Sequence, residues 1–261
     1  MSSVDRFPER LQSRLVKAAS RRFARTRVGQ RVARARIGSR RLPASDQYGF
    51  DRGLPIDRYY IDHFLGRFAC RPGYTSGDIH GHVLEIGGRD YVDRFGVAGE
   101  QPGPGIVHLI DVLHESEINS EGTIFGDLAS PGVLPSDTFD CIICTQVLPV
   151  IWDTRSVLGN LHRSLRPGGV LLLTVPGITR SIVPERDNWG DFWRFTGAST
   201  RRLIVEAFAG GHVEVESYGN LQAATFFLHG FATHELSLAE LQLRDPNYEV
   251  TIAARAIKRE L

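Results

Sequence analysis

Short apolar runs alternate with amphipathic stretches along most of the chain after about residue 80. Many of the runs end in an acid or a glycine, which is typical of buried strands that lead into a loop. The most continuous run, Val170–Val175, is apolar throughout, as strands buried on both faces of a parallel sheet are. The alternation predicts an α/β fold with a doubly wound, mostly parallel sheet. The expected strands lie at Val83–Gly87, Gly105–Asp111, Gly122–Asp127, Thr138–Gln146, Val170–Val175, Val213–Tyr218 and Tyr248–Ala256.

Helices are predicted where apolar residues recur at helical spacing. One helix runs from Asp153 to Ser164 and is stopped by Arg166-Pro167-Gly168-Gly169. Another runs from Ser199 to Phe208, with Ser199 or Thr200 as its N-cap. Further upstream Pro55 can open an aromatic-rich helix, because its missing N–H is not needed at a helix start.

The stretch Val83–Tyr91 combines an apolar strand, an acid and the glycines Gly87 and Gly88. Without a Cβ, glycine lets the backbone turn sharply and approach a ligand closely. Open α/β sheets bind their ligands at the carboxyl ends of the strands. We therefore expect the functional site at this turn.

Three acids, Glu85, Asp111 and Asp127, end three successive predicted strands. In a parallel sheet these carboxylates would converge on one ligand and could accept hydrogen bonds from ribose hydroxyls or an amine. Such charge-assisted bonds contribute about 1.5–3 kcal/mol each. Any one of the acids could instead cap a helix or face solvent, but together they suit a nucleoside that carries an amino acid.

The formal net charge of +1 hides a strong asymmetry, because residues 1–41 hold thirteen basic residues against Asp5 and Glu9. That segment carries +11, and the remainder, with 18 basic and 28 acidic residues, carries −10. Phe7, Leu11 and Leu15 share a helix face, so the segment could form a basic amphipathic helix on an anionic membrane. A solvated or partly disordered arm, or an arm packed on the acidic body, stays open. Nucleic acid is not an expected partner, since the arm lacks interleaved aromatic platforms.

We therefore divide the chain into a basic, helical N-terminal arm, 1–44, and one domain, 45–261. No apolar run reaches the roughly 18 residues of a membrane span, and the N-terminus lacks the apolar segment of a secretory signal. Three cysteines give no disulfide framework. The expected location is the cytoplasm, with the arm as a peripheral contact to the inner membrane surface. Cys141 and Cys144 point to opposite faces of a predicted strand, so no metal site is expected there.

Several pieces of the sequence resemble the class I S-adenosylmethionine-dependent methyltransferases, over roughly Gly81 to Val175. The most specific piece is the Leu-Arg-Pro-Gly-Gly turn before an apolar strand. The pieces Pro55–Ile61 and Trp189–Thr196 are similar to a branch of small bacterial methyltransferases found beside glycosyltransferases. The resemblance rests on Val83–Gly87, Asp111, Gly126-Asp127-Leu128, Phe139–Ile143 and Leu165–Leu171.

The resemblance implies a seven-stranded, Rossmann-like methyltransferase fold with S-adenosylmethionine as the cofactor. It also implies that residues at the strand ends hold this cofactor. These are Glu85, Gly87 and Gly88 at its methionine part, Asp111 at the ribose hydroxyls (or Glu115 if the strand ends later), Asp127 at the adenine amino group with Leu128 beside the ring, and Thr145 and Gln146 on the cleft floor.

The implied reaction is O-methylation of a sugar hydroxyl or a glycosylated small molecule, as in glycan or secondary-metabolite modification. His229 or Asp191 is the candidate general base, since an attacking alcohol must lose its proton. Positioning alone is the alternative, in which a near-attack alignment supplies most of the rate. The expected acceptor-binding residues are Tyr59, Trp189, Trp193 and Arg194.

Two other interpretations stay open. The family pattern has three glycines at alternate positions, and here Arg89 and Tyr91 replace the second and third. The protein could therefore be a binding or scaffolding protein that kept the fold and lost the chemistry. An NAD(P)-dependent oxidoreductase is less favoured, because Asp111 fits its ribose-binding acid but the glycine spacing does not fit its turn.

Overall fold

The computed structural model describes residues 42–70, 77–100, 103, 105–115, 120–181 and 190–260, with residues 26, 28, 29, 31, 32 and 35. The described residues divide into two compact units. One contains those up to Tyr59 together with Gly219–Tyr248, and the other contains those of Tyr60–Tyr218 and from Glu249 onward. The predicted basic arm, 1–44, lies almost entirely outside the described residues, so its helical form stays a prediction.

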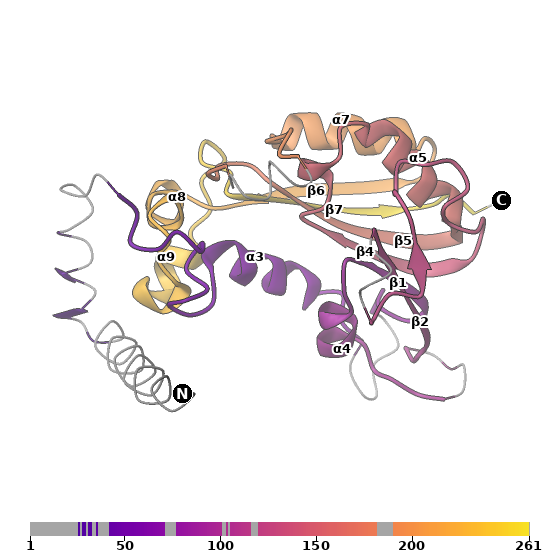
Figure 1. Cartoon of the computed structure of the whole chain (residues 1–261), viewed down its shortest axis with the longest axis horizontal. Helices are drawn as coiled ribbons and strands as arrows, with labels where there is room; N and C mark the ends of the chain where they lie inside the picture. Colours follow the sequence, from indigo (N-terminus) through magenta and orange to yellow (C-terminus); the bar gives the residue numbers. More distant parts are fainter. Residues whose placement is uncertain are drawn as a thin grey trace, which may run out of the picture. The chain divides into compact units, whose positions relative to one another are not determined.

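The second unit is built on a seven-stranded sheet with the strand order β3-β2-β1-β4-β5-β7-β6 (Figure 1). All pairs from β3 to β5 are parallel, and β7 runs antiparallel to both β5 and β6. This arrangement confirms the predicted doubly wound, mostly parallel sheet. The strands are β1 (Gly81–Ile86), β2 (Val107–His114), β3 (Ile124–Phe125), β4 (Phe139–Thr145), β5 (Leu165–Pro176), β6 (His212–Tyr218) and β7 (Thr251–Ile257).

Helices cover both faces of the sheet, because successive residues of the buried strands point to opposite sides. The helices α5 (Thr154–Ser164) and α7 (Gly197–Ala207) pack on one face, where the apolar core is most extensive (Figure 1). The short helix α4 (Asp90–Phe95) and the later residues of α3 (Ile56–Leu65) lie on the other face. None of the helices in the described ranges combines the length and apolarity that crossing a bilayer would need.

Several element boundaries differ from the prediction, and two of them have clear local reasons. The helix α7 begins at Gly197, because Thr196 rather than Ser199 or Thr200 is its N-cap and forms a reciprocal capping box with Ser199. The strand β5 begins at Leu165, before the Pro-Gly-Gly turn, and its pairing with β4 then shifts register. Gly168 takes φ +79° in this irregular start, a conformation that residues with a Cβ avoid.

Cys141 and Cys144 are both fully buried in β4, and Cys144 belongs to the core beneath α5 and α7. Burial raises the pKa of the Cys144 thiol to about 12 and also raises that of Cys141. Both thiols therefore stay protonated at neutral pH and pack as small apolar side chains, as predicted.

The first unit contains α8 (Leu221–Leu228), η2 (Thr233–Glu235) and α9 (Leu238–Gln242). Its centre is an ion pair in which Nε of Arg52 and one of its terminal nitrogens donate to the carboxylate of Glu235, which is 1% exposed. The backbone N–H of Thr233 donates to the carbonyl of Leu54 at 2.8 Å and joins the two stretches of chain. A buried, fully paired charge of this kind holds the unit in one arrangement.

Candidate functional site

The turn after β1 leaves free the space that side chains at Gly87 and Gly88 would occupy. Gly87 has φ +94°, and a Cβ added to it would meet nothing within 4 Å. At Gly88 the nearest atom to an added Cβ is a carboxylate oxygen of Glu121 at 3.8 Å. The N–H of Gly87 donates to the carbonyl of Leu113 in β2 at 2.9 Å, which fixes the turn at the carboxyl edge of the sheet. A ligand could approach the backbone here without meeting a side chain of the turn itself.

Glu85 supports this turn from inside the protein. Its side chain is 3% exposed and accepts the backbone N–H groups of Tyr91 at 3.2 Å and Val92 at 2.8 Å. Burial raises the pKa of the carboxyl to about 7, although the two N–H donors lower it in part. A direct contact of Glu85 with the cofactor stays a prediction, and in the structure its oxygens anchor α4 to β1.

Asp111 does not end its strand, and this prediction was wrong. Val112 and Leu113 continue the apolar run, so β2 extends to His114, and Asp111 pairs with Leu84 inside the sheet. Its carboxylate lies 2.8 Å from His82 Nε2 and accepts the hydroxyl of Thr123 at 2.6 Å. Through these contacts Asp111 links β2 to β1 and to the segment before β3.

Glu115 takes the place that was expected for Asp111. It is exposed and follows the last residue of β2. Two residues before it, Leu113 pairs with Ile86 and accepts the hydrogen bond from Gly87. The sequence contained a signal for the longer strand, because the apolar alternation passes through Asp111. The acid at that position nevertheless looked like the end of a strand.

Asp127 and Leu128 follow the short β3 and face different surroundings. The Asp127 carboxylate is exposed and accepts the N–H of Ala129 at 2.8 Å, so it shapes its own loop. The Leu128 side chain is 2% exposed and belongs to the apolar core, while its carbonyl accepts from Asn160 at 2.8 Å. The place of Leu128 beside a bound ring stays a prediction, and in the structure its side chain packs in the core.

The end of β4 carries backbone strain. Gln146, directly after Thr145, has φ +58°, a left-handed conformation that is uncommon for residues with a Cβ. Its N–H donates to the carbonyl of Thr174 at 2.8 Å, and its side-chain amide lies 3.4 Å from the Thr174 hydroxyl. Strain of this kind persists where the surroundings impose it, and it gathers at functional sites. The predicted cleft-floor residues thus lie at the expected edge of the sheet.

Asp191 and Arg194 form a closed ion pair in the segment that follows β5. The two guanidinium nitrogens of Arg194 donate to both carboxylate oxygens of Asp191, at 2.5 and 2.8 Å, and the Asp191 side chain is 8% exposed. Arg194 also donates to the carbonyls of Arg180 and Trp193. A carboxylate neutralised on both oxygens is a poor proton acceptor, so this geometry favours a structural role for Asp191.

The remaining predicted site residues fall in three places. Trp193 is half-buried, and its Nε1 donates to the carbonyls of Ile151 and Trp152. Trp189 lies outside the described residues. His229 and Tyr59 belong to the first unit, where the His229 carbonyl accepts from Ala44 at 2.6 Å. The catalytic role of His229 and the acceptor contacts of Tyr59 stay predictions.

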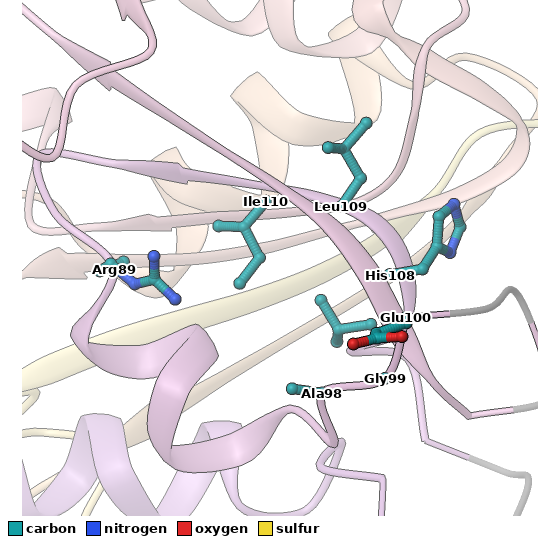
Figure 2. Close-up of a pocket in the computed structure, with 8 residues that line it drawn as sticks. Arg89, Ala98, Gly99, Glu100, His108, Leu109 and Ile110 are labelled. Carbon is teal, nitrogen blue, oxygen red and sulfur yellow. The ribbon is translucent and has the colours of Figure 1, made fainter.

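A cavity of about 560 Å³ lies along the first half of β2 (Figure 2). Arg89, one of the residues in place of a family glycine, borders it, and its guanidinium is held by Asp93 on α4 at 2.8–2.9 Å. The cavity extends from Arg89 toward the start of the strand, away from the carboxyl edge. Sequence reasoning gave no sign of it. Its lining is Arg89, Ala98, Gly99, Glu100, Val107, His108, Leu109 and Ile110.

Comparison with known proteins identifies the class. The family model described as "Methyltransferase domain" matches residues 57–224, which is well over half of the chain. The chain therefore belongs to the methyltransferase domain family. No curated protein matches it.

Solved structures with a similar fold are methyltransferases of low sequence identity. An S-adenosylmethionine-dependent methyltransferase from Mesorhizobium loti shares 16% identity, with a TM-score of 0.49, over 77% of this chain and 97% of that one. The phosphoethanolamine N-methyltransferase 2 of Haemonchus contortus, solved with S-adenosylhomocysteine, shares 14%, with a TM-score of 0.47, over 78% of this chain. The present chain spans about half the length of that enzyme, 53%. A methyltransferase in complex with the Haloferax volcanii Trm112 activator shares 17%, with a TM-score of 0.45, over 69% and 82%. The fold is the Rossmann-like methyltransferase fold, with the sheet order and flanking helices described above.

Proposed function

We propose that the protein is an S-adenosylmethionine-dependent methyltransferase that methylates a hydroxyl of a sugar or of a glycosylated small molecule. The observation that carries the proposal is the open turn at Gly87 and Gly88 on the carboxyl edge of the sheet. Exposed acids follow the next two strands, Glu115 after β2 and Asp127 after β3. Backbone that a ligand can approach, with acceptors beside it, suits a nucleoside linked to an amino acid.

The residues present fit this cofactor, with changes from the expectation at Asp111 and Glu85. The turn would receive the methionine part, Glu115 in place of Asp111 would accept the ribose hydroxyls, and Asp127 would accept the adenine amino group. Glu85 would act through the turn, since its own oxygens hold the N–H groups of Tyr91 and Val92. When bound, the cofactor supplies a methyl group on a positively charged sulfur.

The chain's own contribution to the reaction is mainly alignment. An acceptor hydroxyl placed over Thr145 and Gln146 would attack the methyl carbon. Methyl transfer would form the oxygen–carbon bond as the bond from the methyl carbon to sulfur is lost, and the hydroxyl proton would leave to a base or to water. His229 stays the candidate base from the sequence, while both oxygens of Asp191 are bound by Arg194. Alignment at a near-attack distance can supply most of such a rate enhancement.

Calorimetric titration of the full chain with S-adenosylhomocysteine tests the cofactor directly. We expect saturable binding with a Kd below about 1 mM, which corresponds to at least about 4 kcal/mol. No heat of binding at millimolar ligand would contradict the proposal. Transfer of a labelled methyl group to a panel of glycosides and glycolipids then tests the acceptor class.

The catalytically degenerate alternative is favoured by Arg89 and Tyr91 at the two positions where the family has glycine. In the structure the Arg89 side chain is engaged with Asp93, and the Tyr91 ring stacks on Phe95 at 6.4 Å. Binding of S-adenosylhomocysteine without methyl transfer to any acceptor of the panel favours this alternative. Methyl transfer to one acceptor excludes it.

The basic arm supports a further part of the proposal, a cytoplasmic enzyme held at the inner membrane surface. Its +11 charge in residues 1–41 would bind anionic lipid in a salt-dependent way. We expect the full chain to float with anionic vesicles at low salt and to be released near about 0.5 M salt, while a chain starting at Ser45 stays in solution. Full-length protein that stays in solution at low salt would contradict the membrane role.

A further inference from the structure

Three aromatic residues form an exposed group that we name the aromatic ledge: Trp152, Phe192 and Trp193. Trp152 is 66% exposed and Phe192 is 48% exposed. The Trp152 ring stacks on Trp193, with centroids 4.9 Å apart and planes 26° from parallel. It meets Phe192 edge to face, at 5.6 Å and 76°. The ledge therefore exposes to solvent the ring of Trp152 and, at a steep angle to it, the ring of Phe192.

Backbone hydrogen bonds hold the ledge in place. The indole N–H of Trp193 donates to the carbonyls of Ile151 at 3.1 Å and Trp152 at 3.2 Å. The backbone N–H groups of Phe192 and Trp193 both donate to the carbonyl of Pro149, at 2.7 and 3.2 Å. Trp193 thus uses its only side-chain donor for support, and Trp152 is the most exposed ring of the ledge.

The ledge lies at the carboxyl edge of the sheet. Trp152 follows β4 by way of the short helix η1 (Leu148–Val150), which begins two residues after Gln146. The segment with Phe192 and Trp193 is tied to the end of β5 by the N–H of Phe195, which donates to the carbonyl of Pro176 at 2.9 Å. Since β1, β4 and β5 are parallel neighbours, this is the same edge as the open glycine turn.

The chemistry of the ledge suits a ring with one apolar face and a hydroxylated rim. The face of an aromatic ring is electron-rich, so it attracts the C–H groups that cover one face of a pyranose. Asp153, next to Trp152, accepts the N–H of Ser156 at 3.0 Å and its hydroxyl at 2.7 Å. The Ser156 bonds lower the pKa of this carboxyl, so it stays ionised. A carboxylate has about four acceptor positions, so Asp153 can also accept from a sugar hydroxyl.

We infer that the aromatic ledge is the acceptor-binding subsite and holds a pyranose ring against Trp152, with Asp153 accepting hydrogen bonds from its hydroxyls. The inference rests on the proposed function and deepens it by naming the residues that bind the acceptor. It also reassigns Trp193, which was expected to touch the acceptor, to the support of Trp152.

Ligand-detected NMR with a panel of methyl pyranosides tests the subsite on the full chain, with and without S-adenosylhomocysteine. We expect saturable binding to the wild type, a loss of about tenfold or more in affinity for Trp152→Ala, and a change of at most about threefold for Trp152→Phe, which keeps an aromatic face. Val205→Ala is the matched control, because Val205 is 49% exposed on α7 and takes no part in the ledge. Its affinity should equal that of the wild type.

Each outcome decides the inference. Binding by Trp152→Ala within about twofold of the wild type overturns it. So does the absence of binding by every pyranoside, or binding of flat aromatic alcohols alone. An unchanged affinity for S-adenosylhomocysteine in Trp152→Ala shows that the variant is folded. If S-adenosylhomocysteine does not bind the wild type but pyranosides do, the proposed reaction fails and the subsite stands.

Discussion

Four acids near the carboxyl edge fall into an inner pair and an outer pair. The inner acids, Glu85 and Asp111, lie within strands. Each of their carboxylates is hydrogen-bonded to two protein groups. The outer acids, Glu115 and Asp127, lie past the ends of β2 and β3 and are exposed. The inner acids thus hold the sheet and the glycine turn together, and the outer acids are exposed past the strand ends, where we propose that the cofactor binds.

The difference between the pairs teaches how to assign an acid in this fold. Buried carboxylates must be paired with protein donors, because their desolvation is costly. A buried carboxylate whose oxygens already have such partners gains little from a ligand, whereas an exposed carboxylate can exchange water for a ligand group even when it also accepts from its own loop.

The largest expected effect concerns the pH dependence of stability at Glu85. Its pKa is about 7 in the folded chain against an ordinary value of 4.5, because burial disfavours the charge. Between these pH values the folded chain keeps a proton that the unfolded chain has lost, so the free energy of unfolding falls as pH rises. The expected loss is about 3 kcal/mol between about pH 4.5 and pH 7, with no further change above.

Urea denaturation of the wild type and of Glu85→Gln across this range measures the effect. The variant cannot titrate, so the difference between the two curves should change by about 3 kcal/mol. Glu115→Gln is the matched control, since that side chain is exposed, and it should follow the wild type. Parallel curves for the wild type and Glu85→Gln would contradict the raised pKa, because they would mean that Glu85 has the same pKa in the folded and unfolded chain.

The next effect is on cofactor affinity. Glu115→Ala should weaken binding of S-adenosylhomocysteine by about 1.5–3 kcal/mol, or roughly ten- to a hundredfold, because a charge-assisted bond to the ribose is lost. Its melting temperature should match that of the wild type. Calorimetry and thermal denaturation measure the two quantities. An unchanged affinity would remove Glu115 from the site.

Asp111→Ala should show the reverse pattern. Loss of the carboxylate leaves His82 Nε2 and the Thr123 hydroxyl without this acceptor, so the free energy of unfolding should fall by about 1–2 kcal/mol. Affinity for S-adenosylhomocysteine should stay within about twofold of the wild type. A variant that binds poorly yet unfolds normally would return the ribose role to Asp111 and end the division into inner and outer acids.

The smallest effect concerns the strained residue at the same edge. Gln146→Gly should raise the free energy of unfolding by up to about 1 kcal/mol, because glycine adopts φ +58° without a Cβ clash. Methyl transfer should fall, since the side-chain contact with Thr174 is lost. Denaturation and turnover are measured on the same sample. A lower free energy of unfolding would mean that the Gln146 side chain stabilises the fold by more than its backbone strain destabilises it.

Much of the fold could be predicted from the apolar pattern alone. Continuous runs such as Val170–Val175 are typical of strands buried on both faces of a sheet, and the helix 153–164 shows its buried stripe in sequence. The exact ends of the strands were harder to predict from the sequence. Asp111 looked like the end of a strand, and only its pairing with Leu84 and its bonds to His82 and Thr123 show that the strand passes through it.

The sequence by itself determined the α/β class, the glycine turn, the buried cysteines and the charged arm, since each depends on local composition or spacing. Tertiary structure alone decided which acids are free to bind a ligand and which aromatic ring faces solvent. Trp193 has its indole N–H bound to carbonyls some forty residues away, and Trp152, which no sequence pattern singled out, covers it. Hydrogen-bond partners and exposure are properties of residues brought together from distant parts of the chain, so spacing along the sequence does not contain them.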